Sequence, residues 1–186
     1  MGPHLGRGAT AAARRRRGAH PCALRRGLRA PDRGDVLTTR RFSATEEMPH
    51  TAEQAFTYLV DPRLRPEWQS SLLSTDVPED EEPHLGQAWT ELTVVGVRPS
   101  LVVFEFVPYR SWAERGTWRG VEATLRLRFT ETARGCRVVA EGEVTGSGVY
   151  AVAAGSSGLL AGRAIAADLR TATHRIAQRK ERPADG

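Results

Sequence analysis

The sequence predicts an α+β domain in which an antiparallel sheet packs against a long C-terminal helix. Residues 87–145 contain five segments of strand length that are separated by short turns. Residues 159–179 carry an apolar stripe with helical spacing. A further strand-like segment at 41–48 is followed by two short helical patterns. Together these segments form one domain of about 145 residues, which is long enough to bury its own core.

The positive charge of the chain is concentrated at its N-terminus. The whole chain has a formal net charge of +5, but residues 1–41 hold eleven Arg and two acidic residues, whereas the rest holds sixteen basic and twenty acidic residues. Residues 1–37 contain no aromatic residue, and we expect them to form a disordered, arginine-rich tail. Three interpretations stay open: a solvated tail or translated sequence upstream of a start near Val36, a weak nucleic-acid-binding arm, and an organelle transit peptide.

Capping residues mark the two short helices. The pattern of Thr51 and Gln54 is a capping box and predicts a helix over 51–60. Asp61 followed by Pro62 predicts the start of a second helix, since Asp is a common N-cap and proline suits the first helical position. We expect this second helix to run to about Leu72.

Hairpin arithmetic predicts which side chains share a face of the sheet. If Trp118 lies opposite Val121 across the turn at 119–120, one face is apolar and the other is polar. The same register places small residues on the inner face of the last strand, 136–145, which leaves room for the C-terminal helix. The inner face of the central hairpin then consists of Trp112, Glu114, Gly116, Trp118, Val121, Ala123, Leu125, Leu127 and Phe129.

The C-terminal helix is expected to press one stripe onto the sheet. Ile165, Leu169, Ala172 and Ile176 are spaced by four, three and four residues. Its first turns are rich in glycine and alanine, which indicates a loose start or a face kept small for close approach or for a cavity. We interpret the glycine-rich stretch before it as a flexible entrance and residues 181–186 as a flexible C-terminus.

The order of these elements resembles the SRPBCC superfamily of START-like, helix-grip proteins, which includes polyketide cyclases/dehydrases. The resemblance covers about residues 38–180. It implies one strand, two short helices, a curled antiparallel sheet of five or six further strands, and a long helix gripped by that sheet around an apolar tunnel. The superfamily hosts lipid carriers, cyclases, hydroxylase subunits and chaperone cofactors, so it implies no single function. The matching residues are Phe56–Pro62 with Glu67 and Trp68, Gly86, Phe106–Arg110, and Gly135–Val138, where Cys136 replaces the usual threonine.

The leading functional hypothesis is that a small hydrophobic ligand, such as a lipid, polyketide or isoprenoid-like molecule, binds in this tunnel. Aromatic walls suit such a ligand, although the tryptophans could equally fill the core. A hairpin turn at Gly96 and Val97 would place Trp89 opposite Phe104. The expected ligand-binding residues are Trp68, Trp89, Phe104, Trp112, Glu114, Trp118, Leu125 and Arg163.

Inward acids support a second hypothesis, a cyclase or dehydratase. Glu114 points inward by the register, and Glu46 shares a face with apolar neighbours. Glu91 does the same if its hairpin turns at 96–97. A carboxylate on an apolar face must be paired, hydrated or neutralised, so these acids are either salt-bridged to an inward arginine or available as acid/base groups. Tyr58 or Tyr150 would complete the proton transfer, and Glu114, Glu46 and Tyr150 are the catalytic candidates.

Other functional classes receive little support. The five histidines and two cysteines lack the spacing of a metal site, so we expect neither a metal nor a cofactor. No apolar run is long enough to span a membrane, and a reduced cytoplasmic protein is the default expectation. Both faces of residues 100–107 are apolar, which favours a third hypothesis, a protein-interaction module; the chain is expected to be a monomer or a homodimer.

Overall fold

The structure is a computed structural model that describes residues 37–146 and 158–181. The chain divides into two units, Met1–Arg33 and Gly34–Gly186, and all described residues belong to the second. The predicted disordered tail, the glycine-rich entrance and the flexible C-terminus therefore fall almost entirely outside the described residues.

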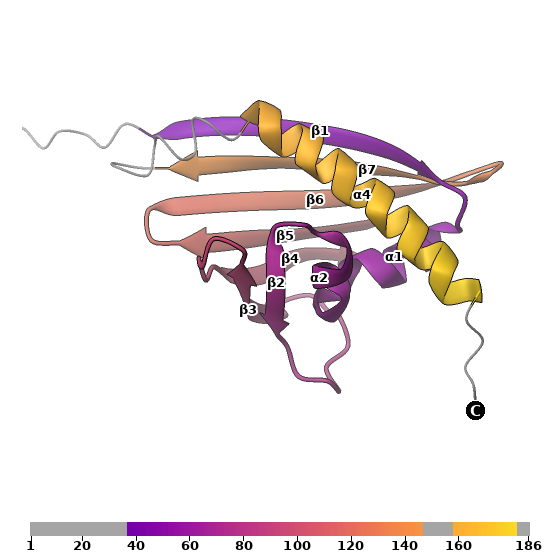
Figure 1. Ribbon diagram of the computed structural model, residues 1–186, viewed down its shortest axis with the longest axis horizontal. Coiled ribbons are helices and arrows are strands. Elements are labelled where there is room, and N and C mark those ends of the chain that lie inside the picture. The colour runs from indigo at the N-terminus through magenta and orange to yellow at the C-terminus, as the bar shows by residue number, and fades with distance from the viewer. Residues whose placement is uncertain (1–36, 147–157, 182–186) are drawn as a thin grey trace, which may run out of the picture. The chain divides into compact units, whose positions relative to one another are not determined.

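Seven strands form one antiparallel sheet in the order β1-β7-β6-β5-β4-β3-β2. The long helix α4 crosses one face of this sheet, and the short helices lie beside the C-terminal half of α4 (Figure 1). The α+β, helix-grip expectation is thus confirmed. The elements are β1 (Thr38–Met48), α1 (Ala52–Val60), η1 (Pro62–Leu64), α2 (Arg65–Trp68), β2 (Leu72–Asp76), β3 (Ala88–Thr93), β4 (Ser100–Val107), β5 (Ser111–Trp118), β6 (Val121–Thr132), β7 (Gly135–Gly146) and α4 (Gly158–Glu181).

The predicted register of the central hairpin is confirmed at every pair that was expected. Trp118 lies opposite Val121, and Glu114 lies opposite Leu125. Across the next turn Leu125 faces Gly142, so the alternation continues into β7. The register follows from sequence because a slip of one residue would turn the whole apolar set toward water.

Two local predictions are wrong. The second helix does not continue to Leu72; it is a 3₁₀ turn followed by the short α2, and Leu72 begins the edge strand β2. Trp89 pairs with Leu101 instead of Phe104, because the register between β3 and β4 differs by three residues from the expected one. The amide of Thr93 donates to the carbonyl of Val97, and this bond closes the turn between the two strands.

The predicted helix caps are present. The side chain of Thr51 accepts from the amide of Gln54, and the side chain of Gln54 accepts from the amide of Thr51, both at 3.2 Å. Asp61 accepts from the amide of Arg63 at 2.9 Å at the start of η1. These caps fix where α1 begins and where η1 begins after it.

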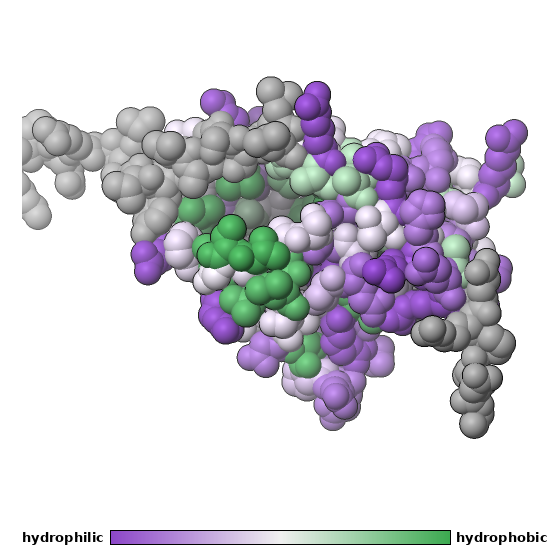
Figure 2. Space-filling model, viewed as in Figure 1, coloured by the Kyte–Doolittle hydropathy of each residue, from purple (hydrophilic) through white to green (hydrophobic). Residues whose placement is uncertain are grey.

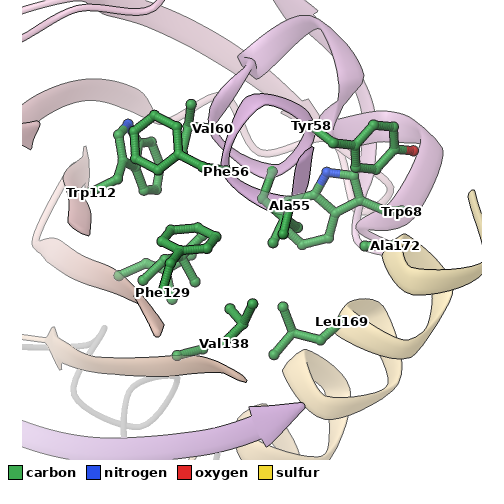
Figure 3. Packing of buried hydrophobic residues seen from close by; sticks show 14 of the residues in the cluster. Ala55, Phe56, Tyr58, Val60, Trp68, Trp112, Phe129, Val138, Leu169 and Ala172 are labelled. Atoms are coloured by element: carbon green, nitrogen blue, oxygen red, sulfur yellow. The ribbon is translucent and has the colours of Figure 1, made fainter. Parts of the chain in front are cut away.

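The core lies between the sheet, α1 and the C-terminal half of α4. Figure 3 shows Phe56 of α1 beside Trp112 and Phe129 of the sheet, and the rings of Phe56 and Phe129 meet edge to face at 5.2 Å between centroids. Leu169 and Ala172 of α4 are fully buried against this cluster. Aromatic and branched side chains therefore fill this end of the interior.

A glycine of β7 makes room for a side chain of the neighbouring strand β1, and α4 packs over that strand. A Cβ at Gly142 of β7 would stand 2.5 Å from Cζ of Phe42, so the ring of Phe42 occupies the space that a side chain would need. A Cβ at Gly162 of α4 would lie 3.5 Å from the carbonyl oxygen of Ser43. The small residues predicted on β7 thus receive Phe42 of β1, and α4 packs over that strand.

Candidate functional site: an apolar cavity with a charged end

A cavity of about 390 Å³ opens between the sheet and the N-terminal half of α4. Its walls come from β1, β3 to β7, α2 and α4, and from the segments that lead into β2 and β4. The apolar residues that line it are Phe42, Val97, Pro99, Leu101, Gly116, Trp118, Val121, Ala123, Leu125, Val144, Ala161, Ala164 and Ile165. Its polar and charged residues are Arg65, Gln69, Ser71, Glu91, Glu114, Thr117, Thr124 and Asp168.

Small residues keep this cavity open. Gly116 of β5 lies opposite Ala123 of β6, and Ala123 in turn lies opposite Val144 of β7. Ala161 and Ala164 line the cavity from the helix above. Of the purposes weighed for the glycine- and alanine-rich start of α4, the structure supports the cavity, because the two alanines leave space there.

Arg65 is the centre of the charged end. This residue of α2 is only 2% exposed. Its Nη1 lies 3.1 Å from Oε1 of Glu91 and donates to Oε2 of Glu114. Its Nε and Nη2 both donate to the side-chain oxygen of Gln69, at 3.1 and 2.9 Å. A short helix and two strands on either side of β4 thus meet in one buried ion cluster.

Aromatic rings enclose this cluster on the side away from the cavity. The guanidinium carbon of Arg65 lies 5.8 Å from the ring centroid of Trp89 and 5.9 Å from that of Trp112, distances at which a cation is attracted to the π face. Trp89 also donates its indole N–H to Oε1 of Glu91 at 3.1 Å. The two rings therefore pack around the buried guanidinium of Arg65.

Burial perturbs the proton affinity of the cluster. Desolvation raises the pKa of Glu114 to about 7; Arg65 opposes this rise, and the nearby charge of Glu91 adds to it. Desolvation lowers the pKa of Arg65, but the two glutamates outweigh it, so this pKa is raised. Glu114 therefore exchanges a proton near neutral pH inside the cavity wall, while Arg65 stays charged.

Several residues proposed from sequence meet at this site. Glu114, Trp118 and Leu125 line the cavity. Trp89 and Trp112 stand behind Arg65 as its aromatic neighbours. The inward direction of Glu114 came from the hairpin register, and its partner is the inward arginine that was weighed as one explanation.

Phe104 and Arg163 do not reach the cavity. Phe104 lies in a bulge of β4 on the opposite face of the sheet, 40% exposed, with the guanidinium of Arg115 5.5 Å from its ring centroid. Arg163 is exposed on α4. The wrong turn position misplaced Phe104, and the helical direction of Arg163 could not be derived from sequence; Arg65 takes the place proposed for it.

The remaining candidates lie elsewhere or outside the described residues. Trp68 is buried beside Tyr58 and Ala172 in the packed core (Figure 3). Glu46 is half-buried on β1 and is not among the described residues that line the cavity. Tyr58 donates its hydroxyl to Glu67 at 3.1 Å, and burial raises its pKa, so it is no proton donor to the cavity. Tyr150 lies outside the described residues.

Arg65, Gln69 and Asp168 are site residues that the sequence analysis missed. Asp168 of α4 is buried, lines the cavity and accepts from the amide of Ser70 at 3.1 Å. The sequence pointed to Arg65 only indirectly. Two carboxylates on an inward face require a buried cation as their partner, and the short helical segment around α2 contains few arginines that could supply it.

Apolar surface continues outward from the cavity rim. Figure 2 shows hydrophobic side chains gathered over β2 and the connection from β3 to β4, where Leu73, Val94 and Val95 are 58%, 54% and 79% exposed. Val97 of the same connection lines the cavity. Apolar side chains thus continue from the cavity wall at Val97 to the exposed Val94 and Val95.

Other sites offer less. A depression of about 580 Å³ is lined by ten residues, of which four are charged: Arg41, Arg126, Glu141 and Glu143. Within residues 37–146 and 158–181, no group of three His, Cys, Asp or Glu could hold a metal ion. In the same ranges no helix combines the length and apolarity that crossing a membrane requires.

Comparison with known proteins agrees with this architecture. A family model described as polyketide cyclase / dehydrase and lipid transport matches residues 39–181. No curated protein matches the chain. Protein MLL2253 from Mesorhizobium loti superposes with a TM-score of 0.58 at 16% identity, covering 75% of this chain and 98% of that one. A protein from Rhizobium leguminosarum gives 0.59 at 11% identity, with coverages of 77% and 98%.

The similar structures include a protein from a biosynthetic pathway. The di-domain ARO/CYC StfQ from the steffimycin biosynthetic pathway superposes with a TM-score of 0.58 at 17% identity, covering 78% of this chain and 53% of StfQ. At these identities the superpositions show the fold, whereas the family model covers more than half of the sequence. The chain therefore belongs to the polyketide cyclase/dehydrase and lipid transport family, which is of the SRPBCC type.

Proposed function

We propose that this protein binds a small apolar molecule in the cavity between the sheet and the N-terminal half of α4. The observation that carries the proposal is the cavity itself: about 390 Å³ of space with mostly apolar walls and a few polar groups at one end. Ligand pockets have volumes of roughly 300–1,000 Å³ and this same mixture of walls. Burial of apolar ligand surface contributes about 25 cal/mol per Å².

The test is a titration with the fluorescent dye Nile red, using two matched variants. Ala123→Phe puts a ring into the cavity, whereas Glu122→Phe puts the same ring on the exposed side of the adjacent position. We expect the wild type and Glu122→Phe to bind with similar affinity and Ala123→Phe to bind at least tenfold more weakly. Equal binding by all three proteins would overturn the proposal.

Glu114 favours a second candidate, a proton-transfer enzyme acting on a polyketide-type substrate. A carboxyl with a pKa of about 7 in an apolar cavity suits general acid/base catalysis at neutral pH. In a dehydration it would take a proton from the carbon beside a carbonyl and return one to the departing hydroxyl, which leaves as water. Tyr58 plays no part in this version, since its hydroxyl is bonded to Glu67.

Dehydration of 4-hydroxy-2-decanone, followed by the absorbance of the enone, tests the enzymatic candidate. Catalysis by the wild type that falls at least a hundredfold in Glu114→Gln would support it, with Glu122→Gln as a control of unchanged rate. A rate equal to that without protein would leave ligand binding as the function.

A further inference from the structure

The charged end of the cavity carries more negative than positive groups. Among the described residues that line it, Glu91, Glu114 and Asp168 have carboxyl groups, and Arg65 is the one cation. When Glu91 and Glu114 are both ionised, their cluster with Arg65 has a net charge of −1. A ligand that enters this cavity therefore meets an anionic end.

The guanidinium of Arg65 is already engaged by the protein. Its Nε and Nη2 donate to Gln69, and its Nη1 serves Glu114 and Glu91. A guanidinium has five N–H groups, and these contacts use most of them. Arg65 therefore cannot offer the two-pronged hydrogen bonding by which arginine ordinarily holds a carboxylate ligand.

The carboxylates retain the capacity to accept hydrogen bonds. Glu114 bonds Arg65 through Oε2, and Glu91 bonds Arg65 and Trp89 through Oε1. The second oxygen of each, Oε1 of Glu114 and Oε2 of Glu91, has no hydrogen bond to the described residues. Both side chains line the cavity, so a ligand group that donates a hydrogen bond finds acceptors there.

We propose that this cavity selects apolar molecules whose polar end donates a hydrogen bond and carries no negative charge, such as long-chain alcohols, phenols or amines, and that it rejects fatty-acid anions. The inference rests on the proposed binding function and narrows its ligand class. A hydroxyl or ammonium satisfies the carboxylate oxygens, and hydrogen bonds to an ionised acceptor are about twice as strong as neutral ones. A carboxylate would be desolvated beside like charges with no free cation.

Competition against bound Nile red tests the selectivity with three ligands of equal chain length: 1-decanol, decylamine and sodium decanoate, at pH 8 and below their aggregation concentrations. We expect decanol and decylamine to displace the dye at concentrations at least tenfold lower than decanoate. Displacement by decanoate at equal or lower concentration than decanol would overturn the inference and leave the binding function standing. Failure of the dye to bind at all would instead overturn the proposed function.

A double variant links the selectivity to its cause. Glu91→Gln with Glu114→Gln removes both negative charges and leaves Arg65 cationic, so decanoate should gain at least tenfold over decanol relative to the wild type. The surface variant Glu122→Gln removes one negative charge outside the cavity and should leave the ratio unchanged. If the double variant folds but the ratio of decanoate to decanol affinity does not change, the selectivity is not caused by these two residues. If the double variant does not fold, the comparison of the three ligands on the wild type still tests the selectivity.

Discussion

The two ends of the interior between the sheet and α4 are built from different residues, although β6 and α4 run through both. Along β6, Val121 and Ala123 line the cavity, whereas Leu127 and Phe129 belong to the packed core. Along α4, Ala161 and Ala164 line the cavity, Leu169 and Ile176 belong to the packed core, and Ile165 contributes to both. On both elements the residues farthest into the cavity are small or short, and the residues of the packed core are large, so the sequence itself leaves this space open.

The charged cluster stands at the boundary between these two ends. Arg65 has the aromatic rings of Trp89 and Trp112 on one side, and the cavity on the other. A charge is tolerated there because its partners reach it from separate elements. The contrast teaches that the packed end provides stability and a fixed frame, while the open end provides space and polar groups.

Removing the cation should have the largest effect. Arg65→Met leaves two buried carboxylates without their partner, and loss of one member of a buried pair costs about 3–5 kcal/mol. Urea unfolding measures the change in the free energy of unfolding. The triple variant that adds Glu91→Gln and Glu114→Gln should regain most of it, whereas Arg115→Met, at an exposed ion pair with Glu122, should change stability by less than about 1 kcal/mol. If Arg65→Met changed the free energy of unfolding only slightly, the two carboxylates would not be buried and paired with Arg65 as described.

Two leucines on one strand compare the ends directly. Leu127 is fully buried in the packed core, and Leu125, two residues away, already faces the cavity. Leu→Ala substitutions in cores cost about 2–5 kcal/mol, more where a larger void is left between packed neighbours. We expect Leu127→Ala to fall near the top of this range and Leu125→Ala near the bottom, by chemical denaturation. Equal costs at the two positions would remove the distinction between the ends.

The pH dependence of stability should reveal Glu114. Its pKa is 4.5 ordinarily and about 7 in the folded protein, so between these values the folded state binds more protons than the unfolded state. The free energy of unfolding contributed by this group therefore decreases as the pH rises from 4.5 through 7, by on the order of 1–3 kcal/mol. Denaturation curves at several pH values should show this decrease in the wild type and in Glu122→Gln, and its loss in Glu114→Gln. An identical profile in Glu114→Gln would place the titration elsewhere.

Alanine substitutions at two glycines should have the smallest effects on stability, and these effects should be of opposite sign. At Gly116, in the cavity wall, a Cβ would lie 3.6 Å from Cγ of Leu101, an ordinary contact, so Gly116→Ala should stabilise by about 0.5–1 kcal/mol through reduced chain entropy. At Gly142 the Cβ would lie 2.3 Å from the carbonyl oxygen of Thr124, and Gly142→Ala should destabilise by about 1–3 kcal/mol. Thermal unfolding compares them, and the same sign at both positions would contradict the described packing.

Much of the fold could be predicted from the spacing of apolar residues and from the positions of turns, whereas less of the site could be predicted in this way. The register from Ser111 to Gly146 could be derived because each hairpin is tight and one face is apolar. The β3–β4 turn could not, since Gly96 lies within the turn, where its amide donates to Thr93, and the strands pair from Thr93 and Val97 onward instead of from Val95 and Arg98. The expected register was therefore wrong by three residues, and for this reason Phe104 was predicted to line the cavity although it lies on the outer face.

The site required contacts between elements that no local pattern encodes. Glu114 was found because strand alternation determines the direction of a side chain. Arg65 was missed because α2 has only four residues, too few for a helical stripe to show which side is buried. The exposed side of β4 remains a predicted self-association surface, although Phe104 there is covered in part by Arg115 and Arg126.

The most direct test is methyl NMR of the full chain during addition of 1-decanol. The account predicts that the methyl signals of Leu125, Val144 and Ile165 shift in a saturable manner, because these residues line the cavity. The methyls of Leu127, Val138 and Leu169, which are fully buried in the packed end, should stay in place. Saturable shifts confined to the packed end or to the exposed Leu73 and Val102, or no shifts at all, would contradict the claim that the open end of the interior is a ligand site.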